Sequence, residues 1–317
     1  MLLRVLRRTG VFAASLVAAS ILVFAFMAIL PGDPARVALG LGAKPAEVAA
    51  LRAEFGLDRP LLVQYLDWVG GLVTGDLGVS FRSELEIGPQ LADRVAVTGW
   101  LVGVGMLIAL LIALPMGTVM ATRHRHPDGT LLSAISQMGI AVPAFITGVL
   151  GIALFAVVLG WLPSNGWVVP NEDPLQFLRH LVLPAVSLGL AQAAVLSRYV
   201  RSAVLDVMRE PYMRTARAKG LTAYRALFSH GLRNAAIPVA TVLGIQLTTL
   251  LVGAIVVERI FVIPGLGSLL MDAVSQRDLI LVQNVVMVLV VAVLLVNYLV
   301  EIFYSLVDPR LRTEGGR

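Results

Sequence analysis

The sequence predicts an all-α membrane protein with six transmembrane helices. Of its 317 residues, 58% are hydrophobic and 14% are charged, whereas about a quarter of the residues in a soluble domain are charged. Mean hydropathy is +0.86. A transmembrane helix needs about 20 mainly apolar residues, and six runs meet that length: residues 11–30, 97–120, 131–159, 181–200, 236–257 and 279–306. Because no repeat or linker divides the chain, we expect a single membrane domain over residues 1–317.

The first run is expected to remain as a transmembrane helix and not to be cleaved as a signal peptide. It follows Arg4, Arg7 and Arg8, as a signal core would. However, its length of about 20 residues exceeds the 7–15 of such cores. The Pro-Gly-Asp-Pro that follows at residues 31–34 also lacks a small-x-small cleavage pattern.

Residues 31–96 form the one large segment expected outside the membrane. Residues 44–55 predict a helix, because Pro45 lies in the first turn and apolar side chains recur at helical spacing. Residues 61–73 contain a tyrosine and a tryptophan and predict a helix on the bilayer surface. Residues 75–81 are rich in turn formers and should connect this helix to the second span.

The distribution of Lys and Arg predicts that both termini are cytoplasmic. Residues 198–235 contain eight basic side chains, the N-terminal segment three, residues 121–130 two and the tail after Asp308 three. The alternate loops, residues 160–180 and 258–278, contain one and two Arg, which acids offset. Every short loop therefore agrees with the same orientation.

What the sequence lacks excludes several kinds of chemistry. Without cysteine there is no disulfide, thiolate metal site or cysteine nucleophile. Without Gly-x-x-x-x-Gly-Lys-Ser/Thr the chain cannot hold ATP phosphates in a P-loop. The net charge of +5 is concentrated in loops between spans, which argues against nucleic acid as a partner. We therefore expect neither an enzyme nor a cofactor or metal site.

Two other functional classes are disfavoured. A self-sufficient secondary transporter predicts ionisable groups within the spans and broken inverted repeats, but Glu301 is the main ionisable group there. A sodium-coupled route is weakened and not excluded. A membrane enzyme would need a convergent catalytic set, and the spans offer scattered Ser, Thr, Asn and Gln.

Glu301 and three prolines within the spans each allow two interpretations. Glu301 either pairs with a loop arginine near the cytoplasmic surface or makes a polar contact inside the bundle. Pro115, Pro143 and Pro184 either bend a transport pathway or only serve helix packing.

The basic stretch 198–233 is the candidate functional site. Leu221, Tyr224, Leu227 and Phe228 recur at helical spacing, so a short amphipathic helix is expected there. On the cytoplasmic side such a helix could dock on a partner protein or lie on anionic lipid headgroups. Composition alone does not separate the two.

A series of motifs follows the chain in order. They are Pro-Gly-Asp-Pro at 31–34, Phe-Gly-Leu-Asp-Arg-Pro at 55–60, Gly-Asp-Leu-Gly-Val-Ser at 75–80, Tyr-Met-Arg-Thr-Ala-Arg-Ala-Lys-Gly at 212–220, His-Gly-Leu-Arg-Asn-Ala-Ala-Ile-Pro at 230–238, Glu-Arg-Ile-Phe-Val-Ile-Pro-Gly-Leu-Gly at 258–267 and Asp-Pro-Arg at 308–310. Together they resemble the inner-membrane permeases of binding-protein-dependent ABC importers, of the peptide/nickel type with DppB/OppB-like subunits.

The resemblance implies a type I ABC importer permease fold in the bacterial plasma membrane. It implies half of a pore for ATP-driven import of di- or oligopeptides, with nickel chelates, glutathione or another small solute as alternative cargo. The implied partners are a second, DppC/OppC-like permease, two ATP-binding subunits or a fused pair, an extracytoplasmic solute-binding protein and membrane lipid. ATP and Mg would be bound by the partner ATPases. Residues 31–96 and 258–278 would receive the binding protein.

In this family the basic loop is the EAA segment, a coupling helix that enters a groove on the ATP-binding subunit. Alignment on Gly220 puts its Glu-Ala-Ala at residues 214–216, where this chain has Arg-Thr-Ala. A compact glycine permits close helix approach, and an apolar face suits docking. The implied coupling residues are Arg214, Thr215, Ala216, Arg217, Lys219, Gly220, Leu221, Tyr224, Leu227 and Phe228.

Overall fold

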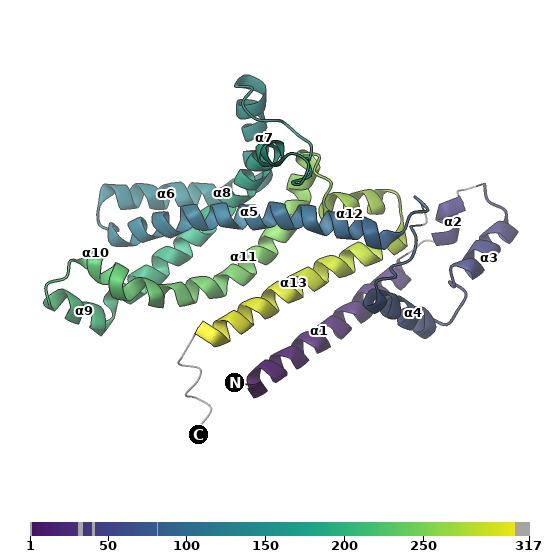
Figure 1. Cartoon of the computed structure of the whole chain (residues 1–317), viewed down its shortest axis with the longest axis horizontal. Helices are drawn as coiled ribbons and strands as arrows, with labels where there is room; N and C mark the ends of the chain where they lie inside the picture. The colour runs from purple at the N-terminus through teal and green to yellow at the C-terminus, as the bar shows by residue number, and fades with distance from the viewer. Residues whose placement is uncertain (1, 31–33, 40–41, 81, 308–317) are drawn as a thin grey trace. The chain divides into compact units, whose positions relative to one another are not determined.

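The computed structural model describes residues 2–30, 34–39, 42–80 and 82–307, and their regular secondary structure is helical (Figure 1). The helices are α1 (Leu2–Ile29), α2 (Pro34–Leu39), α3 (Pro45–Glu54), α4 (Leu61–Thr74), α5 (Ile87–Thr122), α6 (Pro127–Ala141), α7 (Ala144–Gly151), η1 (Ile152–Val158, a π-helix), α8 (Pro174–Arg209), α9 (Pro211–Ala218), α10 (Ala223–Ala226), η2 (Leu227–Gly231, a π-helix), α11 (Leu232–Ile260), α12 (Leu266–Ser275) and α13 (Leu279–Val307). The all-α prediction is confirmed.

Five helical stretches are long and apolar enough to cross a membrane. They are Val5–Ile29, Ile87–Thr122, Pro174–Arg209, Ala223–Ile260 and Leu279–Ile302. Each contains most of one predicted span, so these five predictions are confirmed.

The third predicted span is not one helix. Its place is taken by α6 and the α7–η1 stretch, which meet at an angle of 95°. Val142 is extended at the break and Pro143 caps α7, because proline has no N–H to continue the hydrogen bonds of α6. Pro115 and Pro184, in contrast, lie inside the continuous helices α5 and α8. Of the three prolines, only Pro143 therefore lies at a sharp break.

The chain divides into two compact units. The larger unit consists of residues 1–5, 99–263 and 296–317, and the smaller unit of residues 6–98 and 264–295. Two motif segments, residues 31–33 and 308–310, lie outside the described residues, as does the basic tail. The expectation of a single membrane domain stays a prediction.

Helix α8 is the centre of the larger unit, where it packs against α6, α7 and α11. Small residues allow the close approach of α5: a methyl group at Gly189 would lie 2.9 Å from the carbonyl oxygen of Gly105. The buried Ser136 of α6 donates a hydrogen bond of 2.8 Å to the carbonyl oxygen of Ala194. Contacts between membrane helices typically involve small residues and hydrogen bonds from hydroxyl groups, because these helices gain little free energy from hydrophobic burial against one another.

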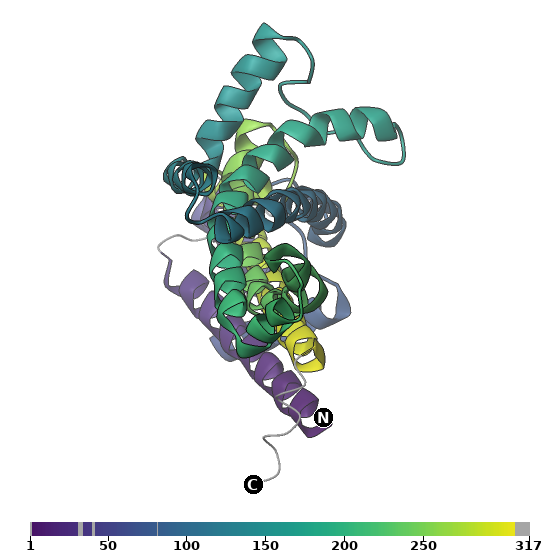
Figure 2. The ribbon, with the colours of Figure 1, turned by 90° about the vertical axis from the view of Figure 1, so that its left-hand side faces the viewer.

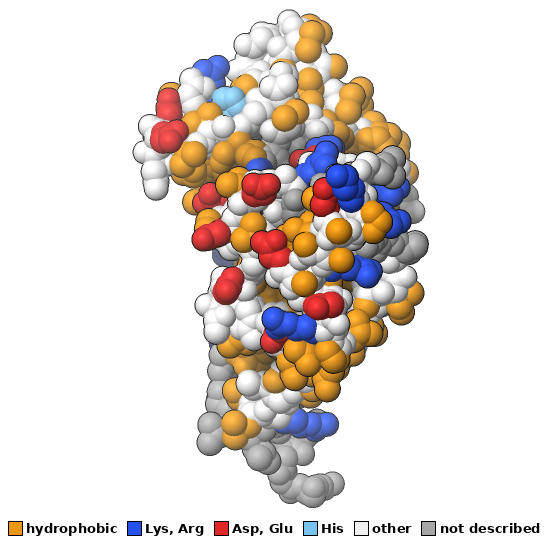
Figure 3. All heavy atoms as spheres, turned by 90° about the vertical axis from the view of Figure 1, so that its right-hand side faces the viewer, with side chains coloured by type: hydrophobic (Ala, Val, Ile, Leu, Met, Phe, Trp, Pro, Cys, Tyr) orange, Lys and Arg blue, Asp and Glu red, His pale blue; other side chains and the backbone are white. Residues whose placement is uncertain are grey.

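An aromatic cluster in the smaller unit joins α1 to α4. The ring centroids of Phe24 and Tyr65 are 5.5 Å apart, and Ser20 and the Tyr65 hydroxyl are hydrogen-bonded at 2.9 Å. Trp68 donates from Nε1 to Oδ1 of the buried Asn284 in α13. The predicted helices at 44–55 and 61–73 are confirmed as α3 and α4; the position of α4 on the bilayer surface stays a prediction. Charged side chains gather over the face formed by this part of the unit (Figure 3).

A buried serine–aspartate pair fixes the turn-rich stretch after α4. The Ser80 hydroxyl donates to Oδ2 of Asp278 at 2.5 Å and accepts from the backbone N–H of Ser83. Oδ1 of Asp278 accepts from the N–H of Leu281 in the first turn of α13, where a carboxylate satisfies a free backbone donor. One carboxylate therefore joins two segments that are 198 residues apart.

Replacement of this carboxylate should loosen the turn. Asp278→Ala leaves the buried Ser80 hydroxyl and the Leu281 N–H without an acceptor, at a cost of about 1–3 kcal/mol. We expect faster limited proteolysis between residues 75 and 86, measured by mass spectrometry of the fragments. Asp58→Ala removes an exposed carboxylate of the same unit and should leave the rate unchanged. Equal rates for both variants would contradict this role.

Candidate functional site

The basic stretch folds as two short helices and a π-helical turn at one end of the larger unit. Helix α8 runs to Arg209, and Glu210 is extended before α9 begins. Figures 1 and 2 show α9 and α10 next to the ends of α8 and α11. The turn between α5 and α6 lies at the same end of this unit (Figure 1). We refer to residues 211–231 as the α9–η2 segment.

Four apolar residues attach the α9–η2 segment to the larger unit. Met213, Ala216, Ala226 and Leu227 are buried in one core cluster with side chains of α8 and α11. Leu221 is half-buried against the same cluster. Since these residues are covered by the chain's own helices, they hold the segment in a fixed orientation.

The amphipathic helix expected from the spacing of residues 221–228 is confirmed only in part: Tyr224, Leu227 and Phe228 lie on one continuous helical stretch, Ala223–Ile260, but Leu221 and Leu227 do not join its exposed face. Gly220, with a φ of +92°, ends the turn after α9, and Leu221 precedes α10 instead of lying on it. Leu227 has no exposed surface, so it cannot belong to an exposed apolar face. That face consists of Tyr224 and Phe228, which are 49% and 55% exposed.

Tyr224 and Phe228 form a stacked pair on the outside of the segment. Their ring centroids lie 5.1 Å apart with an interplanar angle of 24°. The other candidate residues at the surface are Arg214, Thr215, Arg217, Lys219 and Gly220. Protein–protein interfaces typically have aromatic residues at the centre and polar residues at the rim. The stacked pair and the basic residues around it have this composition.

A cavity of about 600 Å³ lies between α9 and the η2–α11 junction. The amide of Asn234 donates to the Tyr212 hydroxyl at 2.9 Å and joins its two sides. The cavity collects four of the candidate residues with five others, in the set Tyr212, Thr215, Ala216, Lys219, Leu221, Ser229, His230, Arg233 and Asn234. The five others had no role predicted from the sequence; for His230, Arg233 and Asn234 the signal was the second motif, at residues 230–238, which folds back beside the first.

The lining of this cavity suits the binding of a partner. In the described part of the chain no group of three or more His, Asp or Glu is placed to hold a metal ion. The cavity contains Lys219, His230 and Arg233 but no carboxylate. It can therefore receive acidic or hydrogen-bond-accepting groups of a partner.

Two family descriptions together cover most of the chain. Residues 113–313, which include the α9–η2 segment, match the binding-protein-dependent transport system inner membrane component. Residues 1–101 match the N-terminal membrane component of the same kind of system. Neither match is to an ATPase subunit.

Relatives of similar length carry permease names. The glutathione transport system permease protein GsiC of Escherichia coli is 41% identical over 294 residues, which cover 92% of this chain and 93% of the relative. A Brucella abortus protein with the provisional name peptide transport system permease protein is 39% identical over 308 residues, 97% of this chain and 98% of the relative.

A solved structure of the methionine ABC transporter MetNI, in an inward-facing conformation, has a similar fold. The TM-score is 0.59 at 21% identity, over 69% of this chain and 96% of that chain. Fold and sequence thus agree, and the chain belongs to the family of binding-protein-dependent transport system inner membrane components.

Proposed function

We propose that this protein forms half of the pore of an ATP-driven importer for small peptides and that its α9–η2 segment docks on an ATP-binding subunit. The observation that carries the docking proposal is the exposed pair Tyr224–Phe228. Membership of the permease family supports the pore and import roles.

The surface around this pair favours a protein partner over lipid. Burying two half-exposed aromatic rings gains free energy in proportion to the apolar area removed from water. The segment is held from beneath by Met213 and Leu227, so a partner meets it with little ordering cost. A helix that only lies on lipid would need an apolar face along its length, but here Leu227 and Ala216 are buried within the chain.

The same attachment gives a route from ATP hydrolysis to the spans. Helices α8 and α11 have 36 and 29 residues, which correspond to about 54 and 44 Å. Since Met213 and Leu227 share one core with both helices, movement of the segment would move them together. Closure of the ATPases would then shift the spans between outward-facing and inward-facing states.

The loops of the larger unit support a cytoplasmic location for the segment. The α5–α6 turn, with its Arg123–Asp128 ion pair, lies at the same end as α9 and α10. The less basic loop 160–180 lies instead at the other end of α11. There the N–H of Gly166 donates a hydrogen bond of 2.9 Å to the carbonyl oxygen of Phe261, the residue that follows α11. The strongly basic loops therefore share one end, as the positive-inside rule requires.

The names of the relatives support peptide as the cargo class. One relative is named for glutathione, itself a tripeptide, and another for peptides. A solute-binding protein would deliver the cargo to the external segments. In the smaller unit a cavity of about 500 Å³ near α4, with the exposed ion pair Arg59–Asp67 on its wall, offers a polar contact surface for it.

Truncation of the aromatic pair should weaken docking. A hot-spot aromatic contributes about 2 kcal/mol or more, so Tyr224→Ala/Phe228→Ala should lower affinity for the ATP-binding subunit by about thirtyfold if one ring dominates and by about a thousandfold if the two losses add. The measurements are co-purification of the ATPase with the tagged chain and uptake of radiolabelled dipeptide or glutathione. Trp161→Ala, which removes another exposed aromatic ring of this unit, is the matched control. Normal co-purification with both variants would disprove docking through this pair.

Substitutions at Gly220 test whether transport depends on the orientation of α10. A side chain there meets no neighbouring atom within 4 Å, but the φ of +92° is unfavourable for most residues. Gly220→Val should therefore strain the turn by about 1–2 kcal/mol and reduce uptake without loss of the protein from the membrane. Gly220→Asn should retain most uptake, because asparagine tolerates positive φ. Equal uptake by both variants would show that the conformation of this turn does not contribute to coupling.

The orientation can be measured directly because the chain has no cysteine. A membrane-impermeant maleimide should label Glu172→Cys in intact cells and Ser229→Cys only after permeabilisation. Both positions are exposed, so reactivity reports the side of the membrane. Labelling in the reverse pattern would place the α9–η2 segment outside the cytoplasm.

A further inference from the structure

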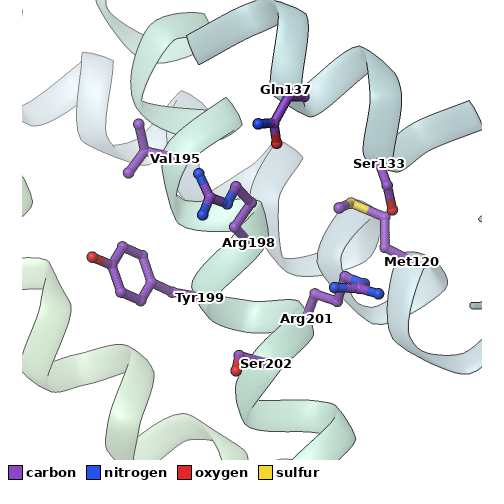
Figure 4. A pocket seen from close by; sticks show the side chains of 8 residues that line it. All are labelled: Met120, Ser133, Gln137, Val195, Arg198, Tyr199, Arg201 and Ser202. Atoms are coloured by element: carbon purple, nitrogen blue, oxygen red, sulfur yellow. The ribbon is translucent and has the colours of Figure 1, made fainter. Parts of the chain in front are cut away.

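We propose that a cavity between α5, α6 and α8 binds the phosphate headgroup of an anionic membrane lipid. The cavity has a volume of about 380 Å³. Figure 4 shows its lining residues: Met120, Ser133, Gln137, Val195, Arg198, Tyr199, Arg201 and Ser202. It lies within the larger unit and is separate from the α9–η2 segment.

The cavity is positively charged and has no counter-ion of its own. Arg198 and Arg201 lie one turn apart on α8, and no lining residue is acidic. Nε of Arg201 is buried and has no hydrogen-bond partner among the described residues. A buried donor without an acceptor is costly. A bound anion would provide that acceptor.

The arrangement of the side chains suits a phosphate group. In Figure 4 Arg198 extends toward Gln137 of α6, whereas Arg201 extends toward the side of Met120 and Ser133. Guanidinium groups bind phosphate oxygens through two parallel hydrogen bonds. The Ser202 and Tyr199 hydroxyls and the Gln137 amide add neutral donors, whereas the Ser133 hydroxyl already donates to the carbonyl oxygen of Gly129. Several oxygens of one phosphate could thus be bound from more than one wall.

The position of the cavity indicates a membrane lipid as the source of the phosphate. Met120 lies two residues before the end of α5, and Ser133 lies in the second turn of α6. The Met120 and Ser133 side of the cavity is therefore within about 10 Å of the α5–α6 turn, near the level of lipid headgroups. Tyr199, 47% exposed, is a residue type enriched at that level. Basic pockets between membrane helices are known to bind anionic headgroups.

Apolar side chains continue from the cavity toward the membrane interior. One turn beyond Gln137 on α6 are Ile140 and Ala141, both exposed, and on α8 Ala191, half-buried, lies one turn beyond Val195. Acyl chains could pack on this surface while the phosphate accepts from the Arg201 guanidinium in the cavity. A soluble anion would use the arginines alone, so the polar cavity with an apolar border favours an amphiphile.

The test measures phosphatidylglycerol bound to the assembled transporter. The tagged complex is reconstituted in phosphatidylcholine nanodiscs with increasing phosphatidylglycerol and analysed by native mass spectrometry. Arg198→Gln/Arg201→Gln should lower phosphatidylglycerol retention about tenfold or more, because charge-assisted hydrogen bonds are lost. Arg125→Gln/Arg209→Gln removes two exposed charges outside the cavity and should retain lipid as the wild type does.

A second variant keeps the test decisive if the double arginine variant fails to assemble. Gln137→Glu leaves both arginines and places a competing carboxylate in the cavity, so it should also lower retention. Equal retention by the wild type and the cavity variants would overturn the proposal. The proposal would also be overturned if the wild type retained no phosphatidylglycerol but bound inorganic phosphate or a dipeptide in a way that requires Arg198 and Arg201. The ligand would then be a soluble anion.

Discussion

Burial of Met213 and Leu227 between α8 and α11 is the interaction on which the α9–η2 segment depends. It turns these residues into the core and leaves Tyr224 and Phe228 at the surface. The segment is thereby joined to two long membrane helices instead of being an independent loop. On the proposed docking, a contact made at the aromatic pair would act on the spans through packed side chains, because packed cores compress little and transmit displacement.

Most of the membrane architecture could be predicted from the sequence because apolar runs of sufficient length have few alternatives in a bilayer. The break in the third span could not. Pro115, Pro143 and Pro184 have the same local chemistry, yet only Pro143 separates two helices at a sharp angle. Whether a proline bends a membrane helix depends on the neighbouring helices that satisfy its free backbone groups, and one sequence does not show those neighbours.

The local structure of the candidate site could not be predicted in detail. The spacing of residues 221–228 implied one regular helix, whereas Gly220 and the π-helical η2 change the direction of successive side chains. Tyr224 and Phe228, four residues apart, still share a face, but Leu227 does not join them. The cavity at Arg198 and Arg201 was not predicted, because it requires α6 to lie beside α8. In the sequence, these basic residues near the end of a span indicated the orientation of the chain in the membrane and not a binding site.

The most direct test of the central claim is photocrosslinking from position 228 in native membranes. A benzoylphenylalanine replaces Phe228 in the full-length chain, and the products of illumination are identified by mass spectrometry. We expect a crosslink to an ATP-binding subunit in complexes that still import peptide. Crosslinks to lipid alone, in complexes with normal uptake, would show that the aromatic pair lies on the membrane surface and that ATP hydrolysis is coupled elsewhere.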